Sequence, residues 1–483
     1  MRLTIRQLFF ILLFLGLFLM TLRPIADPDF WWHLRTGQLI VQNYAIPHTD
    51  SFSFTNNGKP WVAHEWLSEL FMYGLYRLGS YGLLIFAFSL LITGSFFLAY
   101  LRSPQESLPY VAGFTLLLGA ISTAPTWGVR PQMISLFISS LFLYLLDRYR
   151  KEGKLRFIIP LPLITLVWVN LHAGYFLGLA IMAIYIAGEL IDLLKADFKK
   201  IVNSDGLSIK SILILCAVLG ISILATLVNP NGFHIISYPF QTLTNQAMQQ
   251  FIQEWFSPDF HQMEWQPLAW FILAFIGAGM LGKKPISPTK ILLTLVFGYA
   301  ALRSMRFVPL FAIVTVPILA EQLGSLVRFQ SEVKAPSRIL KWMTPILLIS
   351  FMLLVSMRYI QVIQEQSRSI AENFPKAAVD WIAENRPEGY LFNSYGWGGY
   401  IIWRLYPQYP VYIDGRADIY GDKFIYAYTN VYRARPGWEQ VLDSQAVRLV
   451  LVEPESGLAS DLRQSPVWAI EFEDQISVVF SRK

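Results

Sequence analysis

Two aspartates near the start of the chain are separated by a single residue. Asp27 and Asp29 flank one proline and precede the stretch Phe-Trp-Trp-His33. Carboxylates this close together can supply a general base, a metal ligand or both. Asp-Pro and Asp are also favoured in turns and at helix N-caps, which is the structural alternative. The aromatic flank and the nearby acids and histidines favour the functional interpretation.

Further histidines and acids lie in the segments that follow. His33 is joined by His64 and Glu65, and a later segment contributes Glu254. These side chains are candidates for binding substrate or metal, because imidazole and carboxylate groups serve both purposes. The single cysteine, Cys216, lies within an apolar run, so an intramolecular disulfide and a cysteine-based metal cluster are both excluded.

Arginines at the ends of apolar runs point to an anion. Arg130, Arg303 and Arg306 are costly to place there unless they meet a phosphate, which a guanidinium binds with two hydrogen bonds. Snorkelling toward lipid headgroups is the alternative. Because Arg303 and Arg306 are three residues apart, we expect them to share a helix face. His172, in the tight turn Asn-Leu-His-Ala-Gly, is either a further phosphate ligand or a satisfied turn residue.

Loops near the C-terminus carry a third group of candidates. Polar and aromatic side chains follow two predicted strands, where loops of α/β sheets commonly bind ligands. The glycines among them also fit tight turns and close packing. The candidates in these loops are Trp397, Tyr400, Asp414, Arg416 and Asp418.

The composition shows where these residues must be held. Of the 483 residues, 54% are hydrophobic and 15% charged, whereas soluble domains carry about 25% charged residues. With a mean hydropathy of +0.43, the chain is not a cytosolic enzyme, a disordered chain or a small disulfide-rich domain. The net charge of +6 forms no basic stripe, so we expect no nucleic-acid partner. The sequence predicts an α-helical polytopic membrane protein.

Apolar runs long enough to cross a bilayer give a count of about 11 membrane spans. Alternate loops hold 19 Lys and Arg residues on one side and seven on the other, which predicts a cytoplasmic N-terminus. The first run could be read as a signal peptide. The site after Ala26 is a poor cleavage signal, because Pro24 replaces the usual small residue, so we expect a retained span. The predicted spans are 7–23, 81–101, 109–125, 131–147, 155–171, 172–194, 211–228, 267–282, 290–303, 306–323 and 342–360.

This topology divides the chain into a transmembrane domain, 1–360, and an extracytoplasmic domain, 361–483. Two outer loops, 24–80 and 229–266, belong to the first domain. In the second domain, helix-like stretches alternate with short β-rich runs, which is typical of a small α/β sandwich. The expected helices are 375–386 and 436–445, a further helix is expected to open at residues 393–400, and the expected strands are 389–393, 411–413, 447–452, 467–472 and 476–481.

The first outer loop contains two predicted interfacial helices. In one, Leu67, Leu70, Phe71, Gly74 and Leu78 recur on one face, and His64, Glu65, Ser68 and Glu69 fall on the other. In the other, Phe30, Leu34 and Val41 form a weaker apolar stripe. The interiors of the spans lack an ionisable residue at mid-depth, which disfavours an ion-coupled transporter.

These features together resemble the GT-C superfamily of membrane glycosyltransferases, which use polyprenyl-phosphate-linked sugars. The spacing of Asp27, Asp29 and His33 is similar to the D-x-(D/E)-x-x-x-H pattern of lipid-linked glucosyltransferases. A bacterial branch of GT-C-like proteins is closer still, through the motifs Arg130-Pro-Gln, Asn-Leu-His172, Asn229-Pro, Trp397-Gly-Gly-Tyr400 and Asp414-Gly-Arg416. A fainter similarity links residues 395–400 to the Trp-Trp-Asp-Tyr-Gly element of the oligosaccharyltransferase catalytic subunit. That element's aspartate is absent here, so we do not expect peptide N-glycosylation.

The resemblance implies a specific chemistry on the outer face of the cytoplasmic membrane. A sugar would pass from a polyprenyl-phosphate donor to a hydroxyl of a glycan, lipid or protein acceptor. Asp27 or Asp29 would be the general base, with preference for Asp27, while Arg130, His172, Arg303 and Arg306 would hold the phosphate. A divalent metal, Mg²⁺ or Mn²⁺, stays open. Two alternatives also stay open: a flippase for lipid-linked glycans, and a non-catalytic membrane assembly protein.

Overall fold

The computed structural model describes residues 3–104, 109–195, 207–326 and 338–483. By its internal contacts the chain divides into two units. The helical unit comprises Met1–Arg23, Phe86–Gly232 and Gln253–Gln361, and the mixed unit comprises Pro24–Ile85, Phe233–Ile252 and Val362–Lys483. Among the basic residues that predict the cytoplasmic side, five lie outside the described residues: Arg2, Lys199, Lys200, Arg328 and Lys334.

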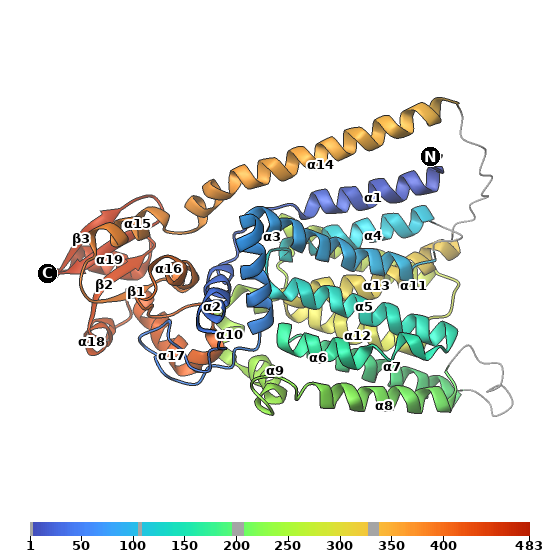
Figure 1. Cartoon of the computed structure of the whole chain (residues 1–483), viewed down its shortest axis with the longest axis horizontal. Coiled ribbons are helices and arrows are strands. Elements are labelled where there is room, and N and C mark those ends of the chain that lie inside the picture. The colour runs from blue at the N-terminus through green and yellow to red at the C-terminus, as the bar shows by residue number, and fades with distance from the viewer. Residues whose placement is uncertain (1–2, 105–108, 196–206, 327–337) are drawn as a thin grey trace. The chain divides into compact units, whose positions relative to one another are not determined.

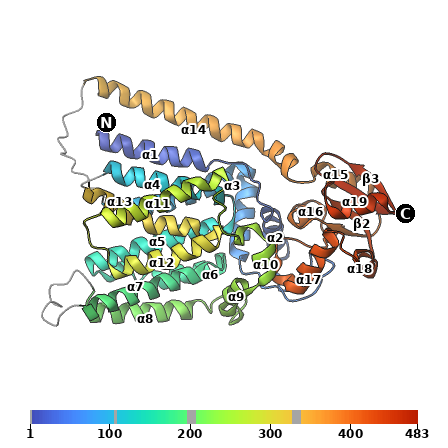
Figure 2. The same cartoon turned by 180° about the vertical axis from the view of Figure 1, so that it is seen from behind.

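Helices running side by side build the helical unit (Figures 1 and 2). Each predicted span coincides with one of them, and α3 and α14 extend into the mixed unit. They are α1 (Ile5–Thr21), α3 (Trp66–Arg102), α4 (Pro109–Thr123), α5 (Pro131–Glu152), α6 (Leu161–Leu171), α7 (Tyr175–Lys195), α8 (Ile209–Ala225), α11 (Gln266–Leu281), α12 (Pro288–Arg303), α13 (Val308–Leu326) and α14 (Arg338–Asn373).

Local sequence signals set the ends of these helices, and apolar faces set their packing. Helix α5 begins after Arg130 with a proline in its first turn and ends at Gly153, which adopts the left-handed conformation that favours glycine. Helix α13 is apolar on every side and buried from Val308 to Ala320, and it packs against α4 and α12. This helix forms the core of the helical unit.

Five helices of the described residues are long and apolar enough to cross a membrane. Three shorter apolar helices accompany them. These helices are typical of an integral membrane protein, which agrees with the class that the composition predicts. The five long segments are Trp66–Arg102, Tyr175–Lys195, Met263–Leu281, Met305–Leu326 and Met343–Asn373.

A four-stranded sheet organises the mixed unit, in the order β1-β2-β4-β3. Strand β1 (Tyr390–Asn393) pairs in parallel with β2 (Val447–Val452), whereas β4 (Val478–Arg482) runs antiparallel to β2 and β3 (Trp468–Glu473). These strands confirm four of the five predicted β-rich runs. The fifth, 411–413, forms only isolated bridges, at Val411. The helices are α15 (Lys376–Asn385), α16 (Gly398–Leu405), α17 (Ala417–Tyr432), α18 (Trp438–Ser444) and α19 (Gly457–Gln464), of which α17 and α19 were not predicted.

Parts of both outer loops belong to the mixed unit. They are α2 (Phe30–Asn43), the start of α3 as far as Ile85, α9 (His234–Thr244) and α10 (Gln246–Phe251). Ser53 and Leu391 each form a parallel bridge with Val411. The ring of Phe54 stacks on Tyr390 with 4.3 Å between centroids. A stretch of the first loop therefore continues the packing of the C-terminal sheet.

The start of α3 is amphipathic, but its polar face is the buried one. Ser68 and Glu69 are only 0% and 1% exposed, whereas Phe71 and Leu78 are 42% and 83% exposed. A helix of a soluble protein shows the opposite pattern, and an apolar outer face suits contact with lipid. The expected stripe on α2 is divided, because Phe30 and Leu34 are buried while Val41 is exposed.

Candidate functional site

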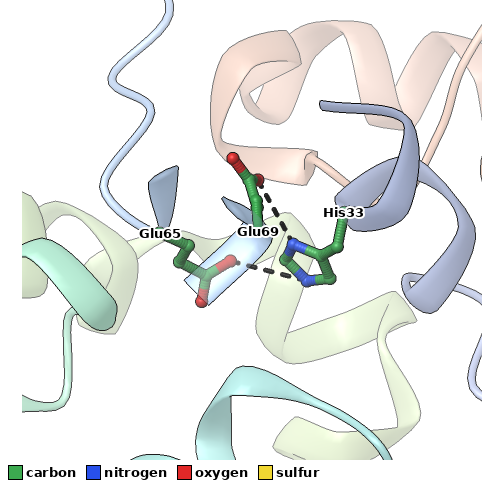
Figure 3. Close-up of side chains that lie close together, drawn as sticks. All are labelled: His33, Glu65 and Glu69. Atoms are coloured by element: carbon green, nitrogen blue, oxygen red, sulfur yellow. Dashed lines mark hydrogen bonds and ion pairs between the residues drawn. The ribbon is translucent and has the colours of Figure 1, made fainter. Parts of the chain in front are cut away.

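A buried histidine lies between two glutamates in the mixed unit (Figure 3). His33 belongs to the first turn of α2, Glu69 to the first turn of α3, and Glu65 directly precedes α3. The Nε2 atom of His33 lies 3.5 Å from Glu65 Oε2, and its Nδ1 atom lies 3.3 Å from Glu69 Oε1. All three residues are at most 6% exposed. Each nitrogen of one imidazole therefore faces a different carboxylate.

The close crossing of α2 and α3 explains this arrangement. Gly37 follows His33 by one helical turn and lies against the backbone of α3. A Cβ atom at Gly37 would overlap the carbonyl oxygen of Glu69 and stand 2.7 Å from its carbonyl carbon. Only glycine permits this approach without displacement of the backbone. The approach places His33 and Glu69 on facing turns.

The cluster continues from Glu65 through a second histidine. His64 Nε2 lies 3.6 Å from Glu65 Oε1, and the His64 ring lies 4.1 Å from the ring of Tyr238. The Tyr238 hydroxyl is hydrogen-bonded to Asp418. Three segments that are remote in sequence, namely the first loop, α9 and α17, thus contribute to one polar cluster.

Burial and charge shift the pKa values in this cluster. Burial opposes the charged form of His64, but the Glu65 carboxylate outweighs that effect and raises its pKa. Burial also raises the pKa of Asp418, although His64 and Arg416 favour its ionised form. Both groups therefore hold a proton more readily than they would in water.

The aspartate pair lies at the N-terminal end of α2 and is half-buried. Asp27 Oδ1 accepts a hydrogen bond from the backbone N–H of Asp29 at 2.9 Å, and Asp29 Oδ1 accepts one from Trp32 Nε1 at 3.1 Å. Asp29 occupies the N-cap position of α2, yet its side chain makes no capping hydrogen bond. The Asp27 side chain therefore supports a turn, as the structural alternative predicts. The Asp29 side chain does not cap the helix.

Candidates from the C-terminal loops have three different environments. Asp418 belongs to the histidine cluster. Arg416 forms buried ion pairs with Asp414 at 2.6 Å and with Asp50 at 2.8 Å, between the rings of Phe52 and Trp61. Tyr400 is buried against the rings of Trp31 and Phe374, and Trp397 is buried at the N-cap of α16. The burial of Arg416 and Tyr400 matches the packing alternative for these loops.

An arginine–glutamate cluster belongs to the helical unit. Arg130, the N-cap residue of α5, forms an ion pair with Glu254 and donates a hydrogen bond to Gln132 at 3.1 Å. Arg306 Nε lies 3.6 Å from the other oxygen of Glu254, and its guanidinium lies 4.8 Å from the centre of the Trp255 ring. Burial opposes ionisation of Glu254, but Arg130 and Arg306 together lower its pKa. Two cations therefore share one carboxylate.

Arg303 and Arg306 do not share a helix face, so this prediction is wrong. Helix α12 ends at Arg303, Ser304 is extended, and Arg306 belongs to a short 3-10 helix, Met305–Phe307. The extended residue redirects the chain, so a spacing of three does not align the two side chains. Arg303 is exposed.

His172 is built into the turn between α6 and α7. Its Nδ1 accepts a hydrogen bond from the backbone N–H of Gly174 at 2.8 Å and lies 2.8 Å from Ser135 Oγ of α5. Because Nδ1 accepts, the proton of the neutral ring is on Nε2. The Nδ1 atom of His172 is therefore satisfied within the turn. The proton that His172 could donate to an anion is on Nε2.

One group among the described residues has the ligand types and spacing of a metal site. It consists of His33, Glu65 and Glu69, whose ligand atoms lie within 4.8 Å of one another. Sequence reasoning selected His33 and Glu65 but not Glu69 or Tyr238. The signal for Glu69 was its spacing of four from Glu65, which puts both carboxylates on one helix face. No local pattern marks Tyr238, because only the tertiary fold brings α9 to His64.

Comparisons with protein-family models and with curated proteins by sequence give no match. Solved structures do match. The chain is similar to the archaeal oligosaccharyltransferase AglB from Archaeoglobus fulgidus, solved with an inhibitory peptide and a dolichol-phosphate. The TM-score is 0.56 at 11% identity, covering 92% of this chain and 69% of AglB.

ArnT from Cupriavidus metallidurans bound to undecaprenyl phosphate matches over nearly all of both chains, 98% and 97%, with a TM-score of 0.52 and 13% identity. The arabinofuranosyltransferase AftD from Mycobacteria gives a TM-score of 0.51 at 13% identity, and the match covers 99% of this chain but 41% of AftD. These neighbours are GT-C glycosyltransferases. The chain has the GT-C fold, so the resemblance inferred from the motifs is confirmed at the level of fold.

Proposed function

We propose that this protein is a GT-C glycosyltransferase that moves a sugar from a polyprenyl-phosphate donor to an acceptor hydroxyl. The observation that carries the proposal is the match to ArnT, which was solved with undecaprenyl phosphate and shares the fold over 98% of this chain. The acceptor belongs to the glycans, lipids or proteins of the cell envelope. The function would place the protein in glycan biosynthesis.

The proposed reaction is a single displacement. The acceptor oxygen attacks the anomeric carbon, the bond between that carbon and the phosphate oxygen breaks, and the anomeric configuration is inverted. A carboxylate accepts the proton of the acceptor hydroxyl. We assign this role to Asp27 or Asp29, with Asp27 as the first choice.

The departing phosphate gains negative charge, so its ligands must be cationic or hydrogen-bond donors. We assign Arg130, Arg303, Arg306 and His172 to this role. Two features support it. Arg130 and Arg306 both contact Glu254, so two cationic side chains lie close together. His172 contacts Ser135, within the first turns of the helix that Arg130 caps, where the helix dipole also favours an anion.

The orientation follows from the distribution of basic residues. We propose a multi-pass protein of the cytoplasmic membrane with about 11 spans, a cytoplasmic N-terminus and residues 361–483 outside. Transfer then takes place on the outer face. The partners are the membrane lipid, the polyprenyl-phosphate-linked sugar and the acceptor, without nucleic acid.

The test replaces each candidate base and measures transfer and lipid binding separately. Asp27→Asn and Asp29→Asn variants are expressed in cells that lack the native gene, and envelope glycans and lipid-linked sugars are compared by mass spectrometry. The purified variants are then titrated with undecaprenyl phosphate. We expect at least one variant to lose the glycan and accumulate the lipid-linked donor, while it binds undecaprenyl phosphate as the wild type does.

Two other outcomes would overturn the proposal. If both variants restore the wild-type glycan, the protein acts without these acids, as a membrane assembly protein would. If reconstituted vesicles move a lipid-linked sugar across the bilayer and the movement survives both substitutions, the protein is a flippase. Exposed Asp259→Asn is the matched control, because this substitution removes an acid from the second loop and should leave all readouts unchanged.

A further inference from the structure

One carboxylate oxygen in the buried cluster has no hydrogen-bond partner among the described residues. Glu69 is 1% exposed, its Oε1 atom lies 3.3 Å from His33 Nδ1, and its Oε2 atom has no hydrogen bond within the described part of the chain. A buried carboxylate oxygen without a partner costs free energy, since burial has removed the water that would solvate it. The Glu69 side chain lies beside His33 and Glu65 (Figure 3).

We propose that His33, Glu65 and Glu69 bind one divalent transition-metal ion, which fastens α2 to α3. The three ligand atoms lie within 4.8 Å of one another, as a shared ion requires. Two carboxylates balance the charge of a divalent cation, and the ion supplies the missing partner for the Glu69 carboxylate. This site goes beyond the proposed transfer reaction, because it has a structural role and does not depend on it.

The ligand types select the ion. Mg²⁺ prefers oxygen ligands and keeps several waters, which a site with an imidazole and little solvent does not provide. Zn²⁺ is bound readily by a histidine nitrogen together with carboxylate oxygens, and Mn²⁺ also accepts both. We therefore expect Zn²⁺ and Mn²⁺ to bind in preference to Mg²⁺.

The geometry around His33 fits a metal ligand. Metal-bound histidines commonly donate their second ring N–H to a carboxylate, which fixes the orientation of the ring. In this cluster each ring nitrogen faces a carboxylate, so Nε2 can bind the ion while Nδ1 donates to Glu69 Oε1, and Glu69 Oε2 is then the oxygen that binds the ion.

The burial of all three ligands indicates a structural ion and not a substrate-binding one. None of the three residues is more than 6% exposed, which leaves no surface for a sugar phosphate. The backbone N–H of His33 donates to the carbonyl of Asp29 at 3.2 Å, so an ion that fixes His33 also fixes the aspartate pair one turn away.

Mn²⁺ binding to the metal-free protein tests the site directly. The full chain is purified in detergent, treated with EDTA and titrated with Mn²⁺, and bound Mn²⁺ is measured by electron paramagnetic resonance. We expect one saturable site per chain. Because loss of an outer-shell partner alone weakens metal binding up to about 100-fold, His33→Gln and Glu69→Gln should each weaken Mn²⁺ binding by about 100-fold or more. Exposed His261→Gln and Glu264→Gln are matched controls that should bind as the wild type does.

Competition and spectroscopy complete the test on the wild-type protein, so a variant that fails to fold does not leave the question open. Zn²⁺ should displace Mn²⁺ at concentrations at least tenfold lower than Mg²⁺ does, and electron spin-echo modulation should show coupling to an imidazole nitrogen. Absence of a saturable site, absence of nitrogen coupling, or equal displacement by Mg²⁺ would overturn the inference. Transfer activity that depends on Asp27 or Asp29 without any metal binding would overturn this site alone and leave the proposed function intact.

Discussion

Gly415 lies directly against the carboxylate of Asp29. A Cβ atom at position 415 would overlap Asp29 Oδ1 and stand 2.8 Å from its Cγ atom. The first turn of α16 makes a similar approach, because a Cβ at Gly399 would stand 2.5 Å from the carbonyl oxygen of Pro28. Two glycines, one at the start of α16 and one in the loop after residue 413, therefore accommodate the Asp-Pro-Asp turn.

Gly415→Ala should impair sugar transfer by displacing Asp29. Misplacement of a reacting group by about 1 Å can reduce a rate by about 100-fold, so we expect a loss between tenfold and 100-fold, roughly. The matched control is Gly396→Ala, because a Cβ at Gly396 meets nothing within 4 Å. Equal transfer rates for the two variants, measured from glycan yield in cells, would show that the position of Asp29 does not matter.

Gly37→Ala should destabilise the protein, whereas Gly74→Ala should not. The added methyl at Gly37 overlaps the backbone of Glu69 and forces α2 from α3, at a cost of about 1–3 kcal/mol in the free energy of unfolding. A Cβ at Gly74 meets nothing within 4 Å, and alanine stabilises a helix interior by about 0.5–1 kcal/mol relative to glycine. Thermal unfolding of the purified variants should therefore shift in opposite directions. Shifts of the same sign would contradict the observed helix crossing.

Arg416→Met should be among the most damaging substitutions in the mixed unit. Asp50 and Asp414 are each 1% exposed or less, and removal of Arg416 leaves both charges buried without their cation. Breaking a buried pair in this way costs about 3–5 kcal/mol. The control Arg463→Met breaks a partly exposed ion pair with Glu473, for which we expect about 0.2–1 kcal/mol. The two melting temperatures, measured side by side, check this difference.

The ion pairs of Glu254 should weaken in acid. Arg130 and Arg306 lower the pKa of Glu254 in the folded protein, although burial acts in the opposite direction. A lowered pKa contributes stability that is complete above the ordinary glutamate pKa, about 4.3, and is lost as the pH falls through the folded-state value. The difference in melting temperature between wild type and Glu254→Gln should therefore be constant from pH 7 to about pH 5 and shrink below about pH 4. A difference that grows in acid would contradict the assignment.

Periodicity and composition predicted the helices well. The apolar runs from 7–23 to 342–360 all coincide with helices, because a run of that length has few ways to satisfy its backbone other than a helix. Four predicted strands were also found, because short alternating or β-branched runs between turn residues are typical of β-strands. Helix α17 was missed because Gly421, with a φ of 73°, interrupts its helical pattern, and α19 because its eight residues are too few to establish a helical period.

The start of α3 shows where a local pattern misleads. Amphipathicity identified the helix but not which face is buried, and here Glu69 is buried while Leu78 is exposed. The direction depends on what surrounds the helix, and that information is not local to its sequence. The same reason explains why Arg303 and Arg306 do not share a helix face. The extended residue Ser304 ends the helix between them.

The sequence by itself determined the class of protein and most of the reactive residue types. The apolar content predicted a membrane protein, and the motifs around Asp27, Arg130 and Trp397 were enough to indicate the GT-C fold. Only the tertiary structure decided which residues meet: His33 with Glu69, His64 with Tyr238, and Arg416 with Asp50. These pairs join segments up to hundreds of residues apart, and their contacts depend on packing distances that no spacing along the chain encodes.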